Sequence, residues 1–155
     1  MTFSRSFAIV LITSTCLFAG SVQAQGAPSK GEQALKFRKS AYQVMAWNFG
    51  PLGAMAQGKV PYDAAEFAKR AERVAQVAPM LSEGFPAETR DLPNSKLKPG
   101  MWTNRADFDA KMKNLVDKSA ALATAAKTGD FAKSKAAFFE TGNTCKNCHD
   151  KYKKD

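Results

Sequence analysis

The chain lacks an apolar run long enough to cross a membrane as a helix, which takes about 20 residues. A mostly apolar stretch, Phe7–Phe18, follows the positive charge of Arg5 and precedes small residues at positions 22–24. Polar residues come next, where a membrane anchor would need a stop-transfer pattern. This order is typical of a secretory signal peptide. We therefore predict that residues 1–24 are cleaved and that residues 25–155 are exported to the periplasm without a membrane anchor.

Histidine and cysteine are also scarce. The 155 residues contain one histidine, His149, and three cysteines. A lipoprotein signal would use Cys16, but the residues before it match a lipobox poorly, so we expect Cys16 to leave with the signal peptide. Cys145, Cys148 and His149 are then one ligand short of a structural zinc site. The simplest alternative for the two cysteines is a disulfide, which an oxidising compartment permits.

No segment has a convincing strand pattern, and aromatic residues are not interleaved with the basic ones. The first absence excludes a thioredoxin-like redox motif, which needs a strand before its cysteines. The second excludes the stacking platforms of proteins that bind single-stranded nucleic acid. The net charge is +9 for the whole chain and +8 once residues 1–24, with one arginine and no acid, are removed. We interpret this charge as a solvated basic surface that can steer docking to an acidic partner.

Apolar residues recur every three or four positions through most of the mature chain, which is typical of amphipathic helices. Gly50-Pro51 interrupts the first stripe, where we expect a kink or a brief break. A second helix opens at Asp63, with Glu66 in a capping-box pattern. The predicted inward-facing residues are, helix by helix, Leu35, Tyr42, Met45, Phe49 and Leu52; Phe67, Ala71, Val74, Ala78 and Leu81; Phe108, Met112, Leu115, Ser119, Leu122 and Ala126; and Phe131, Ser134, Phe138, Cys145, Cys148, His149 and Tyr152.

Residues 82–102 contain three prolines and two glycines and have no stable periodicity. They predict a long connection, of the kind that forms crossover loops or parts of binding sites. A third helix then begins near Thr103 or Asn104 and ends at Gly129, and Asp130 caps a fourth. Four such segments without a convincing strand predict an all-α fold, a four-helix bundle.

Cys145-Lys146-Asn147-Cys148-His149 is the attachment signature of a c-type haem. On a helix, the two cysteines and the histidine fall at positions i, i+3 and i+4, so they project from one face. Two thiols can then form thioethers with the haem vinyl groups while the imidazole reaches the iron. The motif therefore predicts one covalent haem c per chain, with His149 as the axial iron ligand.

A second axial ligand is harder to assign, because the chain has no other histidine. A methionine thioether is the remaining usual donor. Met45 and Met112 lie on inward stripes, although buried methionines commonly fill gaps in a core. Arg38 lies on the apolar seam of the first helix, where it either pairs with a haem propionate or extends outward to solvent. Lys39 beside it either supports the same carboxylate or faces water.

Over essentially the whole mature chain, the sequence resembles the cytochrome c′ family, the class II c-type cytochromes. The resemblance rests on Cys145–Lys154, on Phe37–Met45 in the first helix, on Val60–Ala65 and on Met101-Trp102. It implies a homodimer of antiparallel four-helix bundles in the periplasm. It also implies a five-coordinate, high-spin iron with His149 as its sole protein ligand.

The same resemblance implies roles for four further residues. Arg38 and Lys39 match the positions that contact the haem propionates, although the family commonly has glutamine in place of Lys39. Tyr42 matches the position that guards the open distal face, where the low-spin branch of the class has an iron-ligating methionine. Lys153 matches a basic residue often found on the proximal side, and its alternative is a terminal lysine in solvent.

These observations predict a gas-binding haem protein that takes up nitric oxide and, less well, carbon monoxide. The alternative is a low-spin, six-coordinate electron carrier that uses Met45 as the sixth ligand and meets a periplasmic redox partner. Electron carriers generally prefer six-coordinate iron, because it reorganises little. We expect no enzymatic activity, since no acid–base pair is identifiable near the haem motif.

Overall fold

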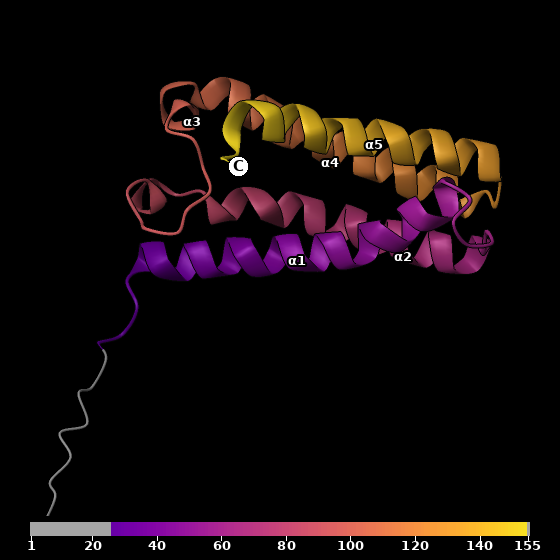
Figure 1. Cartoon of the computed structure of the whole chain (residues 1–155), viewed down its shortest axis with the longest axis horizontal. Coiled ribbons are helices and arrows are strands. Elements are labelled where there is room, and N and C mark those ends of the chain that lie inside the picture. Colours follow the sequence, from indigo (N-terminus) through magenta and orange to yellow (C-terminus); the bar gives the residue numbers. More distant parts are fainter. Residues whose placement is uncertain (1–25, 155) are drawn as a thin grey trace, which may run out of the picture.

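The computed structural model describes residues 26–154, so the predicted signal peptide and Cys16 lie outside the described residues. Four long helices, α1 (Lys30–Ala56), α2 (Ala64–Val77), α4 (Arg105–Lys127) and α5 (Phe131–Tyr152), form a bundle. The chain reverses direction from each of them to the next (Figure 1). α1 packs against α2 and α5, and α4 packs against α2 and α5. The prediction of an antiparallel four-helix bundle is confirmed.

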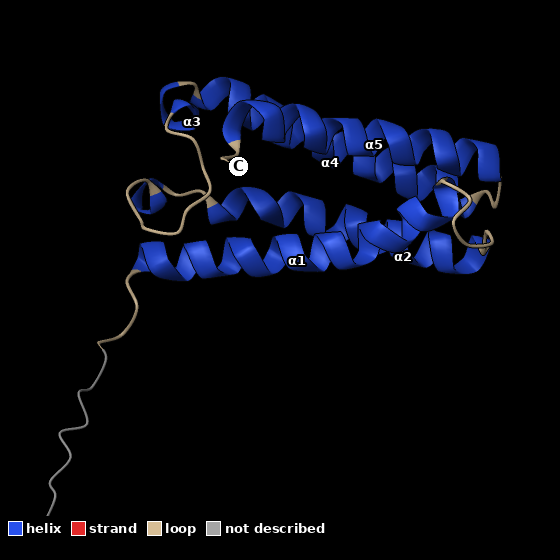
Figure 2. Cartoon of the chain, in the orientation of Figure 1, coloured by secondary structure: helices blue, strands red, loops and turns tan. Residues whose placement is uncertain are grey.

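Helices account for almost all regular structure within residues 26–154, and the connections are loops and turns (Figure 2). One isolated antiparallel bridge pairs Leu97 with Lys153. In this part of the chain no helix is both long enough and apolar enough to cross a membrane.

The predicted stripes of α2 and α4 form much of the core. All five residues of the α2 stripe and all six of the α4 stripe are buried. Asp63 caps α2, since its carboxylate accepts a hydrogen bond from the Glu66 N–H at 2.9 Å. The expected reciprocal half of this capping box is wrong. The Glu66 carboxylate pairs with Arg70 at 2.7 Å instead, and the Asp63 N–H donates to the Met55 sulfur at 3.5 Å.

The second helix changes character before its stripe ends. α2 stops at Val77 and continues as a 3₁₀ helix, η1 (Ala78–Gly84), which carries the last two stripe residues, Ala78 and Leu81. Pro79 explains the change, because it has no N–H to donate along an α-helix. The predicted long connection follows, with a short 3₁₀ turn, η2 (Ala87–Thr89), and one helical turn, α3 (Gly100–Thr103).

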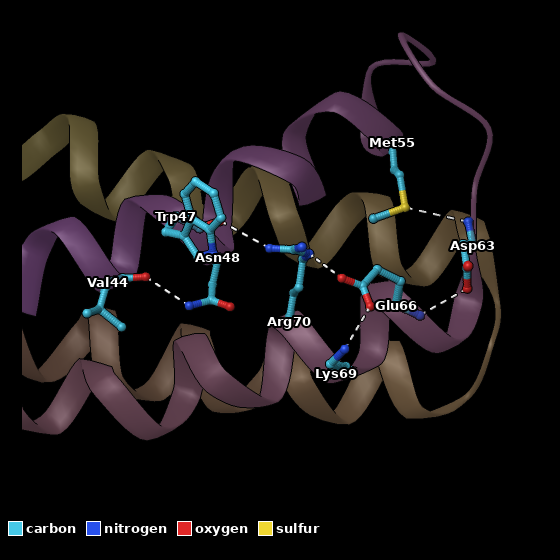
Figure 3. A network of polar contacts seen from close by, with 8 residues as sticks. All are labelled: Val44, Trp47, Asn48, Met55, Asp63, Glu66, Lys69 and Arg70. Carbon is cyan, nitrogen blue, oxygen red and sulfur yellow. Dashed lines mark hydrogen bonds and ion pairs between the residues drawn. The ribbon is translucent and has the colours of Figure 1, made fainter.

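Of the kink or brief break expected at Gly50-Pro51, the break is wrong, because α1 is one continuous helix across Pro51. Its ribbon changes direction only in the last turns (Figure 1). Pro51 cannot donate to the Trp47 carbonyl four residues earlier. Arg70 of α2 donates to that carbonyl instead, through Nη1 at 3.2 Å. Figure 3 shows the Arg70 guanidinium between Trp47 and Glu66, so a neighbouring helix supplies the missing donor.

Both ends of the α4–α5 turn match the sequence. Gly129 adopts a φ of 71°, a left-handed conformation that glycine adopts without strain and that commonly ends a helix. The Asp130 carboxylate then accepts from the Lys133 N–H at 3.1 Å and caps α5. α5 runs from here to Tyr152 without interruption and carries the haem motif in its last two turns.

Candidate haem site

A cavity of about 920 Å³ lies between α1, α4, α5 and the long connection. This volume falls within the range of about 300–1,000 Å³ that is usual for cofactor sites. The cavity is lined by six of the seven predicted site residues and by both methionine candidates. These residues come from three helices, α1, α4 and α5. The seventh, Lys153, follows directly after α5 and lines the cavity too. In chain order the predicted residues on its wall are Arg38, Lys39, Tyr42, Met45, Met112, Cys145, Cys148, His149 and Lys153.

The haem motif occupies the wall formed by α5. Cys145 and Cys148 are half-buried free thiols, so no disulfide joins them. Burial raises the pKa of both thiols. His149 was expected to face fully inward, but it is exposed at the edge of the cavity. It lies in the last turn of α5, where the bundle ends and fewer side chains cover it. Burial, and then the charge of Lys153, lower its pKa.

Phe131 is a second exception on this helix. It was expected to face the core, but its side chain is 38% exposed. It stands in the first turn of α5, at the opposite end of the bundle. Its ring packs against Tyr62, with ring centres 4.8 Å apart.

Arg38 projects into the cavity from α1 and is only 6% exposed, so the outward-extending alternative is wrong. Its Nη2 donates to the Ser95 hydroxyl at 3.0 Å, and the guanidinium lies 4.6 Å from the centre of the Phe85 ring. Its Nη1 is buried without a hydrogen-bond partner among the described residues. Burial lowers the pKa of Arg38. A buried cationic donor without a partner is costly, so this atom calls for an anionic acceptor in the cavity.

A haem propionate fits that requirement. It is a carboxylate on the cofactor that the cysteine motif attaches, and guanidinium–carboxylate bonds are strong and directional. Gly84 makes the arrangement of Arg38 possible. A Cβ at Gly84 would lie 2.5 Å from the Arg38 Cβ, so only glycine lets η1 pack so closely on α1.

Tyr42 faces the same cavity one turn after Arg38. Its ring meets Phe85 edge-on at 6.4 Å, and its hydroxyl donates to the Met112 sulfur at 3.9 Å. Burial raises the pKa of Tyr42, and the two cysteines raise it further, which places its hydroxyl near the haem motif. The side chain therefore stays a neutral phenol at physiological pH. Met45, one turn further along α1, is buried on the same wall.

Lys39 and Lys153 are exposed residues at the mouth of the cavity. The main-chain N–H of Lys153 donates to the His149 carbonyl at 2.9 Å, so Lys153 directly follows the turn that carries the histidine.

Sequence reasoning missed the part of the wall formed by the connection. Ser95, Lys96 and Leu97 line the cavity, although their segment has no periodicity that would indicate burial. The connection is fastened to the end of α5 by two main-chain hydrogen bonds of 2.8 Å. They run from the Lys98 N–H to the Tyr152 carbonyl and from the Lys154 N–H to the Lys96 carbonyl. Lys111 of α4 is a further cavity residue that no sequence signal indicated.

A helical bundle with this motif on one wall of its cavity and a buried, partly unsatisfied arginine on another is a c-type cytochrome. Comparison with known proteins identifies the family within this class. A sequence profile of the cytochrome c′ family matches residues 33–153. This chain belongs to the cytochrome c′ family, as the motifs predicted.

The chain matches these relatives over almost the whole of their length. Cytochrome c′ of Rubrivivax gelatinosus is 41% identical over 127 residues, which cover 80% of this chain and 96% of that protein. The structure of cytochrome c prime from Shewanella frigidimarina matches with a TM-score of 0.79 and 43% identity, covering 83% of this chain and all of the other. A ferrous variant of cytochrome c prime from Alcaligenes xylosoxidans with bound nitric oxide matches with a TM-score of 0.75 and 34% identity, covering 83% and 99%. Proteins of this family carry covalently bound haem c, which confirms the predicted cofactor.

Proposed function

We propose that this protein is a periplasmic, non-enzymatic haem c protein that binds nitric oxide, and carbon monoxide less well, at a five-coordinate iron. In this role it buffers or senses nitric oxide, and it acts as a homodimer. The nitric oxide complex of the Alcaligenes xylosoxidans relative supports the ligand. The bound haem supplies an iron centre that takes up diatomic gases and exchanges electrons.

In this proposal, residues of α1 and of the end of α5 would hold the haem from two walls of the cavity. Cys145 and Cys148 attach it covalently, and His149 on the same helical face ligates the iron. Arg38 binds a propionate through the Nη1 that has no partner among the described residues, with Lys39 as a second contact at the cavity mouth. Lys153 places a positive charge beside His149 and tunes the potential of the iron.

The observation that carries the proposal is the phenol of Tyr42 on the cavity wall that α1 contributes. A tyrosine ligates iron as a phenolate, but burial raises the pKa of Tyr42 and so keeps it protonated. Its side-chain hydrogen bond within residues 26–154 is a long one, to the Met112 sulfur. The ring therefore restricts access to the iron, and its O–H is available to donate to a bound gas molecule.

A six-coordinate electron carrier is the second candidate, and one observation favours it. Both Met45 and Met112 line the cavity. A shift of α1 or α4 would bring one of their thioethers to the iron. Met45 is 7% exposed and Met112 is 5% exposed, and both already fill space in the core. Using either as a ligand would remove those packing contacts.

Absorption spectra of the ferrous protein with and without nitric oxide test the proposal. We expect a five-coordinate, high-spin spectrum that changes when the gas is added. A sharp low-spin spectrum that the gas leaves unchanged would contradict it and point to a methionine ligand, and Met45→Leu should then convert it to high spin. In His149→Ala we expect the normal iron spectrum to be lost while the haem stays attached through both thioethers.

A further inference from the structure

His149 has no partner in the described chain that would hold its ring in place. A histidine that ligates a metal almost always donates its second ring N–H to a carboxylate, a main-chain carbonyl or a water, which fixes the direction of the ring. Within residues 26–154 no side chain or carbonyl hydrogen-bonds the His149 imidazole, which is exposed at the edge of the cavity. The direction in which the ring points therefore depends on the helical turn that carries it.

One carboxylate of α4 holds that turn. Asp107, in the first turn of α4, accepts a hydrogen bond from the Lys151 ammonium at 3.0 Å and another from the Tyr152 hydroxyl. Hydrogen bonding from Tyr152 and then from Lys151 lowers the pKa of Asp107, so its carboxylate is charged at neutral pH. Bonds to an ionised acceptor are roughly twice as strong as those between neutral groups. Two adjacent residues that follow His149 in the chain thus share one anion on the neighbouring helix.

Tyr152 connects this carboxylate to the wall of the haem cavity. Its side chain is only 2% exposed, and its ring lines the cavity and meets Phe108 edge-on at 5.6 Å. Its carbonyl accepts from the Lys98 N–H at 2.8 Å, so the long connection fixes its main chain as well. Release of the hydroxyl from Asp107 would therefore free the last turn of α5 at the cavity wall itself.

Other ion pairs of α5 do not act on this turn from α4. Lys146 and Asp150 pair within α5, at 2.5 Å. Lys118 of α4 pairs with Glu140 of α5 at 2.7 Å, but Glu140 precedes the histidine by more than two helical turns. The Lys118–Glu140 pair joins the same two helices and so provides a natural comparison for Asp107.

We propose that Asp107 is a positioning residue for the haem: by binding Lys151 and Tyr152 together, it fixes the last turn of α5 against α4 and sets the direction from which His149 meets the iron. The proposal rests on the proposed ligation of the iron by His149 and not on gas binding. Outer partners that orient a metal ligand change metal affinity or activity by about 10- to 100-fold when they are removed. Asp107 does this through the helical turn, where other proteins use a bond to the ring.

The test compares Asp107→Ala with Glu140→Ala in the haem-loaded protein. The iron–histidine stretching band in resonance Raman spectra of the ferrous protein reports the geometry of the bond to His149. Amide hydrogen exchange reports opening of the last turn of α5. Glu140→Ala is the matched control, because it removes the carboxylate of the other α4–α5 ion pair. Tyr152→Phe removes one donor and leaves Asp107 in place, and urea unfolding shows that each variant is folded.

In Asp107→Ala we expect the iron–histidine band to shift and broaden. The amides of residues 149–153 should exchange about 10- to 150-fold faster, which corresponds to the loss of a hydrogen bond to a charged group. Tyr152→Phe should produce part of both changes in the parent protein and add little in the Asp107→Ala background, because its partner is already gone. Glu140→Ala should leave both measurements unchanged.

An unchanged band in Asp107→Ala would overturn the proposal even if exchange quickens, because Asp107 would then hold the helix end without orienting the ligand. Equal band shifts in Asp107→Ala and Glu140→Ala would also overturn it, since any loosening between α4 and α5 would then suffice. A parent protein without an iron–histidine band would remove the basis of the proposal by contradicting ligation through His149. That result is distinguishable, because it appears before any variant is made.

Discussion

Arg70 should stabilise the fold chiefly because Pro51 leaves a helical carbonyl without its donor. In the structure, Arg70 donates to the Trp47 carbonyl at 3.2 Å and pairs with Glu66 at 2.7 Å. A hydrogen bond contributes a net of roughly 0.5–1.5 kcal/mol, and an i,i+4 ion pair about 0.3–0.5 kcal/mol. Arg70→Met keeps most of the aliphatic stem and loses both interactions. We therefore expect it to lower the free energy of unfolding by about 1–2 kcal/mol.

The contribution of the Arg70 hydrogen bond should depend on Pro51, and a variant without this proline tests that dependence. In a Pro51→Ala background the new alanine N–H can donate to the Trp47 carbonyl, so Arg70→Met should cost only the ion pair, about 0.3–0.5 kcal/mol. Urea unfolding of the haem-loaded single and double variants, followed by circular dichroism, gives the coupling energy. Lys69→Met is the matched control, because Lys69 also pairs with Glu66 but has no bond to α1. If Arg70→Met costs the same in both backgrounds, the neighbouring helix does not replace the donor that proline lacks.

Four other variants probe the site and the helices. Gly84→Ala should destabilise the haem-loaded protein by about 1–3 kcal/mol, because its Cβ would overlap Arg38. Gly142→Ala, whose Cβ would meet only ordinary contacts, should raise stability by about 0.5–1 kcal/mol in the same urea titration; a loss there would mean that α5 needs glycine. Hydrogen bonding from the Lys133 N–H lowers the pKa of Asp130, so the folded state binds this proton less readily than the unfolded state. The resulting stability is present above about pH 4 and is lost as the pH falls through the folded-state pKa. Acid unfolding of Asp130→Asn should thus be less steep than that of the parent protein, and parallel curves would contradict the assignment. Tyr42→Ala should speed nitric oxide association in stopped-flow measurements, whereas an unchanged rate would mean that the ring does not guard the iron.

The sequence by itself determined the features that depend on local spacing. The stripe of α4, from Phe108 to Ala126, is buried at every predicted position, because residues three and four apart share a face of any α-helix. The same geometry brings Cys145, Cys148 and His149 to one wall, and the cap at Asp130 needs only its own first turn. The four long helices, the haem motif and its placement on α5 are all local in this sense.

Only the tertiary structure decided the features that depend on residues far apart in the chain. Pro51 indicated a kink or a brief break, but Arg70, 19 positions later, supplies a donor and α1 continues. Arg38 had two interpretations until burial and its bond to Ser95, 57 positions away, excluded the outward one. The hydrogen bonds, burial and charge environment of a side chain depend on which distant residues pack against it. Local spacing therefore identifies the helix that carries the haem motif but does not determine the residues that surround it.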